Sequence, residues 1–161
     1  MRRGLIHSVE LAQKEFENAK ALIACVELQE VRLSRFKFIS SLDDRSQPDG
    51  QIEISSTSRS NPTIAGSAFR ISFDLGLQGH QEGILIIDIT ARIEAIYSVP
   101  EDKTFSAAQM KAFSRSNGML NIWPYWREYV QAATQRAGLA PLTLPLFRVR
   151  SQPAKLVHER R

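Results

Sequence analysis

The stretches SAFRISFDLGL (67–77) and ILIIDITARIEAIY (84–97) contain the strongest strand patterns in this chain of 161 residues. In the first, bulky apolar residues alternate with polar residues or glycine, which is typical of a half-buried strand. In the second, one face is apolar throughout and the other is mixed. Only QGHQEG (78–83) separates them, which is the length of a hairpin loop. The pair therefore predicts an antiparallel sheet with one apolar face.

Two further strands are expected before this hairpin. In VRLSRFKFISS (31–41) the apolar parity changes between Leu33 and Phe36, which predicts a bulge at the two residues between them. QIEISSTS (51–58) predicts a short strand. SRSNPTIAG (58–66) is interpreted as a connection, because it combines a proline with turn-forming residues.

A helix is predicted ahead of the sheet, over residues 8–25, with Ser8 as its N-cap. Apolar residues recur there at alternating spacings of three and four, which places them on one helix face. They are Leu5, Val9, Ala12, Phe16, Ala19, Ile23 and Val26. Such a stripe has to be covered, either by the same domain or by an oligomer or partner interface.

Two helices are predicted after the sheet. Ser106 and Gln109 form a capping box at the start of the first helix, and Asn117-Gly118 is expected to end it. A residue before proline avoids helical geometry. Trp123 is therefore expected to cap the second helix, with Pro124 as its first residue.

Gly138 is expected to stop the second helix, and LAPLTLPLF (139–147) follows it. Pro141 and Pro145 interrupt this apolar segment and forbid a helix or a central strand. We expect an extended apolar arm. Strands and helices are segregated along the chain, which predicts a single α+β domain with a four-stranded antiparallel sheet and an extra N-terminal helix. The expected order is a helix at 8–25, the sheet at 26–98, two helices at 106–138, and the arm with a basic tail at 139–161.

The composition is that of an ordinary globular protein, with 43% hydrophobic residues and a net charge of +4. No window is long and apolar enough for a membrane span, and acidic residues interrupt the N-terminal apolar run too early for a secretory signal. We expect a cytoplasmic protein. The positive charge gathers in residues 101–161, which hold ten basic and four acidic residues. A nucleic-acid or anionic-ligand binder acting through its basic C-terminal segment is therefore the alternative function.

The sequence offers no catalytic or metal-binding cluster. His7, His80 and His158 are far apart, and none has a companion at metal-ligand spacing. The single Cys25 excludes an intrachain disulfide, and Asp43-Asp44 lies in a polar stretch typical of a loop. We predict a protein that is not an enzyme and needs no cofactor or metal.

Aromatic residues concentrate in NIWPYWREYV (121–130), which holds both tryptophans and two of the three tyrosines. Together, this window and the arm provide more apolar surface than is needed to cover a sheet with one apolar face. Exposed apolar patches mark binding or oligomer contacts, and aromatic residues are enriched in interface cores. The alternative is that all of these residues fold into the core of one chain.

The longer segment NIWPYWREYVQAATQRAGLAPLTLP (121–145) resembles the signature of SecB-type protein-export chaperones. That pattern has an aromatic residue, Pro-Tyr, a variable residue and Arg-Glu, followed by a helix and a proline-containing apolar arm. The matching positions are Trp123, Pro124, Tyr125, Arg127 and Glu128. SecB-like chaperones of toxin–antitoxin systems, which protect an aggregation-prone antitoxin, carry a similar window.

The resemblance implies a homotetramer, organised as a dimer of dimers, whose grooves hold unfolded client polypeptides without ATP. The partners it implies are such clients, an antitoxin, or the SecA motor. This chain is basic, whereas export chaperones of the family are typically acidic and dock on SecA through acidic sheet-face residues. Pro124, Arg127 and Glu128 are expected to be structural positions, and Arg127 and Glu128 to fix the helix and subunit contacts. The residues expected to contact clients or form the groove are Ile52, Ile54, Met119, Leu120, Trp123, Tyr125, Trp126, Leu142, Leu144, Leu146 and Phe147.

Overall fold

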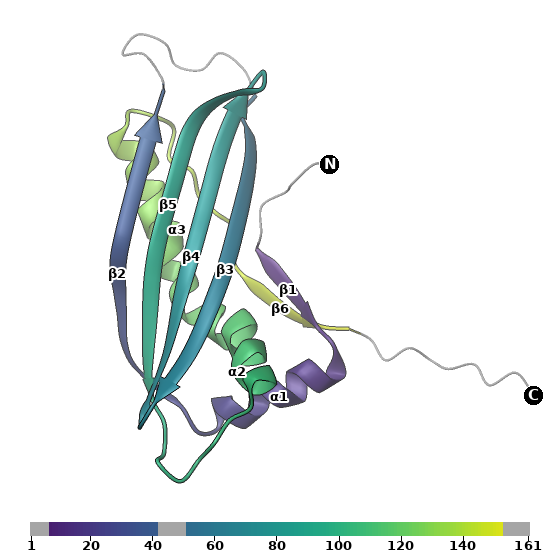
Figure 1. Cartoon of the computed structure of the whole chain (residues 1–161). Helices are drawn as coiled ribbons and strands as arrows, with labels where there is room; N and C mark the ends of the chain where they lie inside the picture. The colour runs from purple at the N-terminus through teal and green to yellow at the C-terminus, as the bar shows by residue number, and fades with distance from the viewer. Residues whose placement is uncertain (1–6, 42–50, 153–161) are drawn as a thin grey trace, which may run out of the picture.

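The computed structural model describes residues 7–41 and 51–152. Its elements follow the order shown in Figure 1. They are β1 (Ser8–Leu11), α1 (Gln13–Ile23), β2 (Glu27–Ser40), β3 (Glu53–Ala65), β4 (Ala68–Gln81), β5 (Ile84–Ser98), α2 (Ala107–Phe113), the π-helical turn η1 (Ser114–Gly118), α3 (Met119–Arg136) and β6 (Arg148–Ser151). Leu5, Asp43, Asp44, His158 and the basic tail from residue 153 lie outside the described residues.

The main sheet is antiparallel and has the strand order β2-β5-β4-β3. Figure 1 shows α2 and α3 together on one face of it, with α1 beside α2. A second, two-stranded sheet pairs β1 with β6 in parallel. The predicted α+β class, with a four-stranded antiparallel sheet covered by helices on one face, is confirmed.

The apolar face of β4 and β5 forms the core, as the alternating pattern predicts. Directly paired residues lie on the same face of a sheet, and Phe69 pairs with Tyr97 while Phe73 pairs with Ile93. All four side chains are at most 1% exposed. The hairpin turn is tighter than expected, because β4 continues to Gln81 and only two residues with positive φ connect it to β5.

The two edge strands are longer than the sequence pattern indicates. In β2 the pairing with β5 shifts between Leu33 and Arg35, which confirms the predicted bulge. The assignment of 58–66 as a connection is wrong, because β3 runs to Ala65 and pairs with β4 throughout. Pro62 misled that interpretation. A proline is tolerated in β3 because edge strands need no N–H donor on their outer side.

The N-terminal helix begins later than predicted. Ser8 is not an N-cap but the first residue of β1, and α1 begins at Gln13 after the N-cap Ala12. The predicted apolar stripe is only partly buried, since Ala19 is enclosed while Phe16 and Ile23 are exposed. Pairing with β6 explains the later start of the helix, because residues 8–11 form a strand there instead of a helical turn.

The two predicted C-terminal helices are one continuous helical segment. Asn117-Gly118 does not end a helix, because η1 joins α2 directly to α3. Trp123 and Pro124 are likewise interior residues of α3 rather than its cap and first residue. The predicted capping box of Ser106 and Gln109 is confirmed at the start of α2.

Gly118 is required by packing rather than by a helix end. Its φ is −56°, an ordinary helical value. A Cβ at this position would lie 3.0 Å from Ile71 Cδ1 and 3.1 Å from Phe73 Cζ, closer than nearly all real Cβ contacts. Gly118 therefore packs directly against Ile71 and Phe73 of β4. The nearby buried hydroxyl of Ser116 donates a hydrogen bond to the Ala112 carbonyl at 2.7 Å.

Gly138 ends α3 as predicted. Its φ of +73° is the left-handed conformation that favours glycine. The N–H of Gly138 donates to the Gln135 carbonyl, and the N–H of Leu139 donates to the Thr134 carbonyl. This pair of bonds is a Schellman motif, which satisfies the last carbonyl groups of the helix. No helix within the described ranges is long and apolar enough to cross a membrane.

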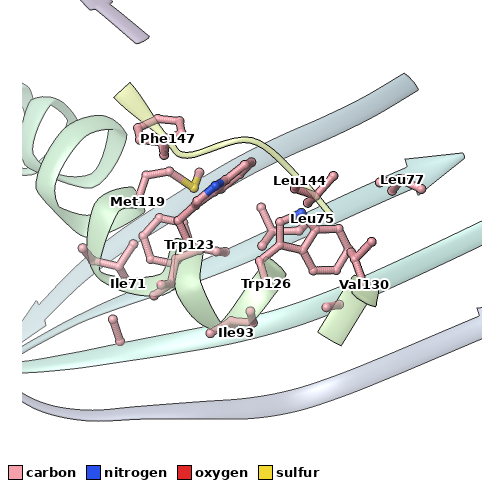
Figure 2. Close-up of a cluster of buried hydrophobic side chains, with 14 of the residues drawn as sticks. Ile71, Leu75, Leu77, Ile93, Met119, Trp123, Trp126, Val130, Leu144 and Phe147 are labelled. Carbon is pink, nitrogen blue, oxygen red and sulfur yellow. The ribbon is translucent and has the colours of Figure 1, made fainter. Parts of the chain in front are cut away.

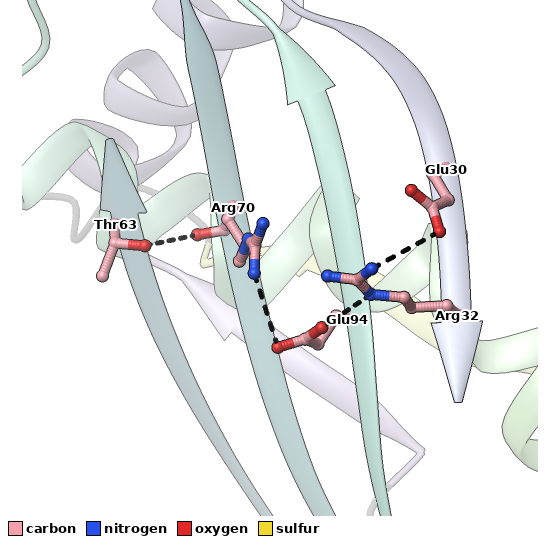
Figure 3. Close-up of polar contacts among 5 residues, drawn as sticks. All are labelled: Glu30, Arg32, Thr63, Arg70 and Glu94. Carbon is pink, nitrogen blue, oxygen red and sulfur yellow. Dashed lines mark hydrogen bonds and ion pairs between the residues drawn. The ribbon is translucent and has the colours of Figure 1, made fainter. Parts of the chain in front are cut away.

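The sheet face opposite the helices carries cross-strand ion pairs that involve Asp74, Arg92 and Glu94. Arg92 donates to both carboxylate oxygens of Asp74, at 2.8 and 2.9 Å. Figure 3 shows Glu94 between Arg32 and Arg70, with Arg32 Nε at 2.9 Å. The hydrogen bond from Arg92 holds the pKa of Asp74 below its ordinary value. Arg32 does the same for the pKa of Glu94.

We expect the substitution Gly118→Leu to lower the free energy of unfolding by about 1–3 kcal/mol, because the new side chain overpacks the contact with Ile71 and Phe73. Urea denaturation measures this change. Ala108→Leu on the exposed side of α2 is the control and should stay within about 0.5 kcal/mol of the parent protein. Equal stability of the two variants would contradict the close approach at Gly118.

Candidate functional site

The two tryptophans of the aromatic window at 121–130 point into the core. Figure 2 shows Trp123 and Trp126 packed between the sheet and the arm, near Ile93, Leu144 and Phe147. Trp126 is 1% exposed, and Trp123 is 4% exposed. The Trp123 ring lies 5.2 Å from that of Phe147, measured between centroids. This part of the window therefore serves the core of one chain.

Two hydrogen bonds fasten the arm to α3. The indole N–H of Trp123 donates to the Pro145 carbonyl at 2.8 Å. Arg127 Nε donates to the Leu144 carbonyl at 2.7 Å. Prolines leave the arm without a regular strand or helix, so its carbonyl groups need partners from elsewhere. Arg127 supplies one, and its role is to hold the arm within the chain.

The predicted client-contacting residues divide into two groups by burial. Five of them are enclosed in the hydrophobic core: Met119, Trp123, Trp126, Leu144 and Phe147. Three are exposed: Leu120, Tyr125 and Leu146. Three are half-buried against the core: Ile52, Ile54 and Leu142. Of the predicted structural positions, Pro124 and Glu128 are exposed, and Arg127 is half-buried.

Neighbouring positions of α3 thus have opposite environments. Tyr125 is 44% exposed, whereas Trp126 beside it is enclosed. Each step along a helix turns a side chain by about 100°, so adjacent residues point in different directions. Ile52 and Ile54 are half-buried beside Gly79 of β4, whereas Leu120 and Tyr125 are exposed residues of α3.

A cleft of about 620 Å³ lies beside the edge strand β3. The small hydroxyl residues Ser58 and Ser60 of β3 form one wall, and α2 and β1 form others. Its apolar lining comes from Val9, Pro62, Met110, Met119 and Phe147. Two cations, Lys111 and Arg115, stand at its rim, and Arg115 Nη1 contacts Glu15 Oε1 of α1 at 2.6 Å.

The cleft offers an extended chain both backbone and side-chain partners. Edge strands present backbone groups to which another extended segment adds by strand pairing, and β3 ends the four-strand order. Methionine is flexible and polarizable, so it adapts to side chains of many shapes. The cleft therefore has the chemistry to hold apolar, extended polypeptide rather than one rigid small molecule.

A second apolar surface lies along the opposite edge strand. Leu28, Leu33 and Phe36 of β2 pair with core residues of β5, so they lie on the helix-covered face. Each is nevertheless more than a third exposed. The centroid of the Phe36 ring lies 5.9 Å from that of Tyr129. Through this contact α3 covers part of the Phe36 side chain. We call these three residues the β2 strip.

The chain's ionisable groups show no assembled acid–base or metal site within the described ranges. No group of three His, Cys, Asp or Glu residues there is placed to hold a metal ion. His80 lies in β4 opposite Leu85 and Glu53 rather than in a loop. Burial raises the pKa of Tyr97, whose hydroxyl accepts a hydrogen bond from Asn121 at 3.0 Å. That contact joins β5 to α3.

Sequence reasoning missed the cleft and the β2 strip. The cleft needs β1, β3 and Phe147 side by side, and these are separated by large distances along the chain. The β2 strip was visible only as a strand pattern, because its exposure depends on which strand lies at the edge. One signal in the sequence could have indicated the cleft. Ser58 and Ser60 of β3, which pair with Leu75 and Phe73 of β4, are small polar residues on an otherwise apolar face.

Comparison with solved structures identifies the fold class. No protein-family model matches the chain, and no curated protein matches it either. The structure is similar to that of the SecB-like chaperone Rv1957 of Mycobacterium tuberculosis, solved in complex with a ChAD peptide from the HigA1 antitoxin. The TM-score is 0.74 at 19% identity, covering 83% of this chain and 99% of that one.

A weaker likeness links the chain to a protein of unknown function from Streptococcus agalactiae, with a TM-score of 0.45 at 11% identity. It covers 75% of this chain and 97% of that one. The first comparison, together with the sheet and helix arrangement, shows that this chain has a SecB-like fold. The resemblance inferred from residues 121–145 is confirmed at the level of fold.

We expect Arg127→Met to release the arm, because it removes the hydrogen bond to the Leu144 carbonyl but keeps the length of the side chain. Loss of a bond from a charged donor costs about 1.5–3 kcal/mol. Hydrogen–deuterium exchange should become faster in residues 139–147. Glu128→Gln, one position along and exposed, is the control and should leave that exchange unchanged. An unchanged rate in Arg127→Met would show that the Trp123 hydrogen bond and the apolar contacts hold the arm without Arg127.

Proposed function

We propose that this protein is an ATP-independent molecular chaperone, a holdase for unfolded or non-native polypeptides. The observation that carries the proposal is the cleft beside β3, where Met110, Met119 and Phe147 face an edge strand. Unfolded chains are extended and apolar, and an edge strand with an adaptable apolar lining suits many sequences. A holdase acts by mass action, because it lowers the concentration of free unfolded client.

The class of client follows from the SecB-like neighbour. That chaperone is in complex with an antitoxin peptide, and the present chain shares its fold. We therefore propose that the protein protects an antitoxin, and we prefer this role to protein export through the SecA motor. The exposed Tyr125, Leu120 and Leu146 extend the client-binding surface beyond the cleft.

We assign the β2 strip to contact between copies of the chain. Edge strands with exposed apolar residues favour pairing with another strand unless something covers them. Leu28, Leu33 and Phe36 form such an edge. Two copies that meet there would bury the strip and extend the sheet. The proposed assembly is a homotetramer, organised as a dimer of dimers.

A light-scattering assay tests the holdase activity. The protein at a several-fold molar excess should suppress aggregation of a chemically unfolded substrate without nucleotide. Met110→Lys places a charge in the cleft and should raise the concentration needed for half suppression by about tenfold, the equivalent of about 1.4 kcal/mol of binding. Ala108→Lys adds the same charge on the exposed side of α2 and should retain full activity. Absence of suppression by the parent protein would refute the proposal, and full activity of Met110→Lys would place client binding elsewhere.

The oligomer is tested by multi-angle light scattering. The expected mass is four times the 18.2 kDa of one chain. Leu33→Arg should lower the mass, because it places a charge in the β2 strip. Lys37→Glu changes the charge on the opposite face of the same strand and should leave the mass unchanged. A monomeric parent protein would contradict the assignment of the strip.

A further inference from the structure

The sheet face that is turned away from the helices carries a row of arginines. Sheet register places Arg59 of β3, Asp74 of β4, Arg92 of β5 and Arg35 of β2 side by side across all four strands. Arg92 is bonded to Asp74 through two hydrogen bonds. Arg35 Nη2 lies 3.7 Å from Asp74 Oδ1, and its side chain is 66% exposed. The row therefore holds three guanidinium groups and one carboxylate.

The next row along the sheet has short side chains on three strands and a lysine on the edge strand β2. It consists of Thr57, Gly76, Thr90 and Lys37, again one from each strand. A Cβ on Gly76 would lie 2.6 Å from Thr57 Oγ1, so any other residue would require the threonine to move. We call Thr57, Gly76 and Thr90 the floor. A hollow of about 500 Å³ results, with the arginine row as one wall.

The hollow has an excess of positive charge. The residues that line it include three arginines and the single carboxylate of Asp74. The nearest acids in the rows on either side have partners of their own. Glu94 is held by Arg32 at 2.9 Å, and Asp88 accepts a hydrogen bond from Gln78 at 3.2 Å. An incoming anion thus meets cations that the described acids of this face do not neutralise.

We propose that this hollow binds carboxylate side chains of an acidic polypeptide segment. Guanidinium groups match carboxylates through paired hydrogen bonds, and Arg35 and Arg59 are placed to supply them. The hydroxyls of Thr57 and Thr90 on the floor donate further hydrogen bonds.

The surroundings favour a peptide over nucleic acid. A nucleic acid strand carries a charge on every residue, so the carboxylates of Asp74 and Asp88 on either side of the floor would repel it. A peptide places its acids at chosen positions and avoids both. Binding of single-stranded nucleic acid also uses aromatic rings for base stacking, and none of the described residues that line this hollow is aromatic.

The site is independent of the proposed client cleft. The cleft is lined by residues of β1, α2 and α3 on the helix-covered side of the sheet, whereas the hollow is lined by the arginine row on the other face; of these lining residues, Ser58 of the edge strand β3 belongs to both. Both can therefore be occupied together. An acidic partner can be recruited whether or not the helix side carries a client, and the inference stands if the holdase proposal fails.

The test uses the full chain and a short fluorescein-labelled peptide of alternating glutamate and glycine, followed by fluorescence anisotropy. A peptide with glutamine in place of glutamate and an oligothymidine of equal charge are the comparison probes. The glutamate peptide should bind, and its affinity should fall as salt is added, because screening weakens exposed charge pairs. Arg59→Glu and Arg35→Glu should each weaken binding by about tenfold, because each replaces an attractive charge with a repulsive one.

Arg136→Glu at the exposed end of α3 is the matched control, with the same change in net charge far from the hollow. Retention of binding in this control, with loss in the two hollow variants, supports the site. Three results would overturn the proposal: no binding of the glutamate peptide, equal weakening by Arg136→Glu, or equal binding of the glutamine peptide. Tighter binding of oligothymidine that is lost in Arg59→Glu would assign the hollow to nucleic acid instead.

Discussion

The structure depends on a mismatch of width between one helical segment and the sheet it covers. Four strands at about 4.8 Å spacing place the outer strands roughly 14 Å apart. A helix with its side chains is only about 10–12 Å wide. The segment from α2 to α3 packs against β3 at one end and β5 at the other, so it crosses the sheet obliquely. Both edges therefore stay partly uncovered, one as the cleft beside β3 and the other as the β2 strip.

The centre of the fold was predictable because local pattern and tertiary packing agree there. Strict alternation in β4 and β5 coincides with burial of Phe69 and Tyr97 against the helices. The prediction was wrong where a residue has two uses. Gly118 suits a helix end and also a close approach to a sheet, and Pro124 suits a helix start but also occurs inside α3. Only the three-dimensional arrangement separates these uses.

The candidate site was less predictable than the fold, for a related reason. Apolar character was visible from the sequence, but the rotational phase of α3 against the sheet decides that Trp126 is enclosed and Tyr125 is not. The arginine row shows the same limit. Arg35, Arg59 and Arg92 lie on three strands that are distant in the sequence, and sheet register alone brings them into line.

The pairing of β1 with β6 has a consequence for biosynthesis. Ser8 is opposite Arg148, so the two strands meet only after the main sheet and the helices between them have been translated. Contacts between such distant positions form late, because a long loop has to close first. Leu11 of β1 is fully enclosed in the finished fold and lies opposite Ser151 of β6. The nascent polypeptide is therefore itself vulnerable to misassembly during its own synthesis.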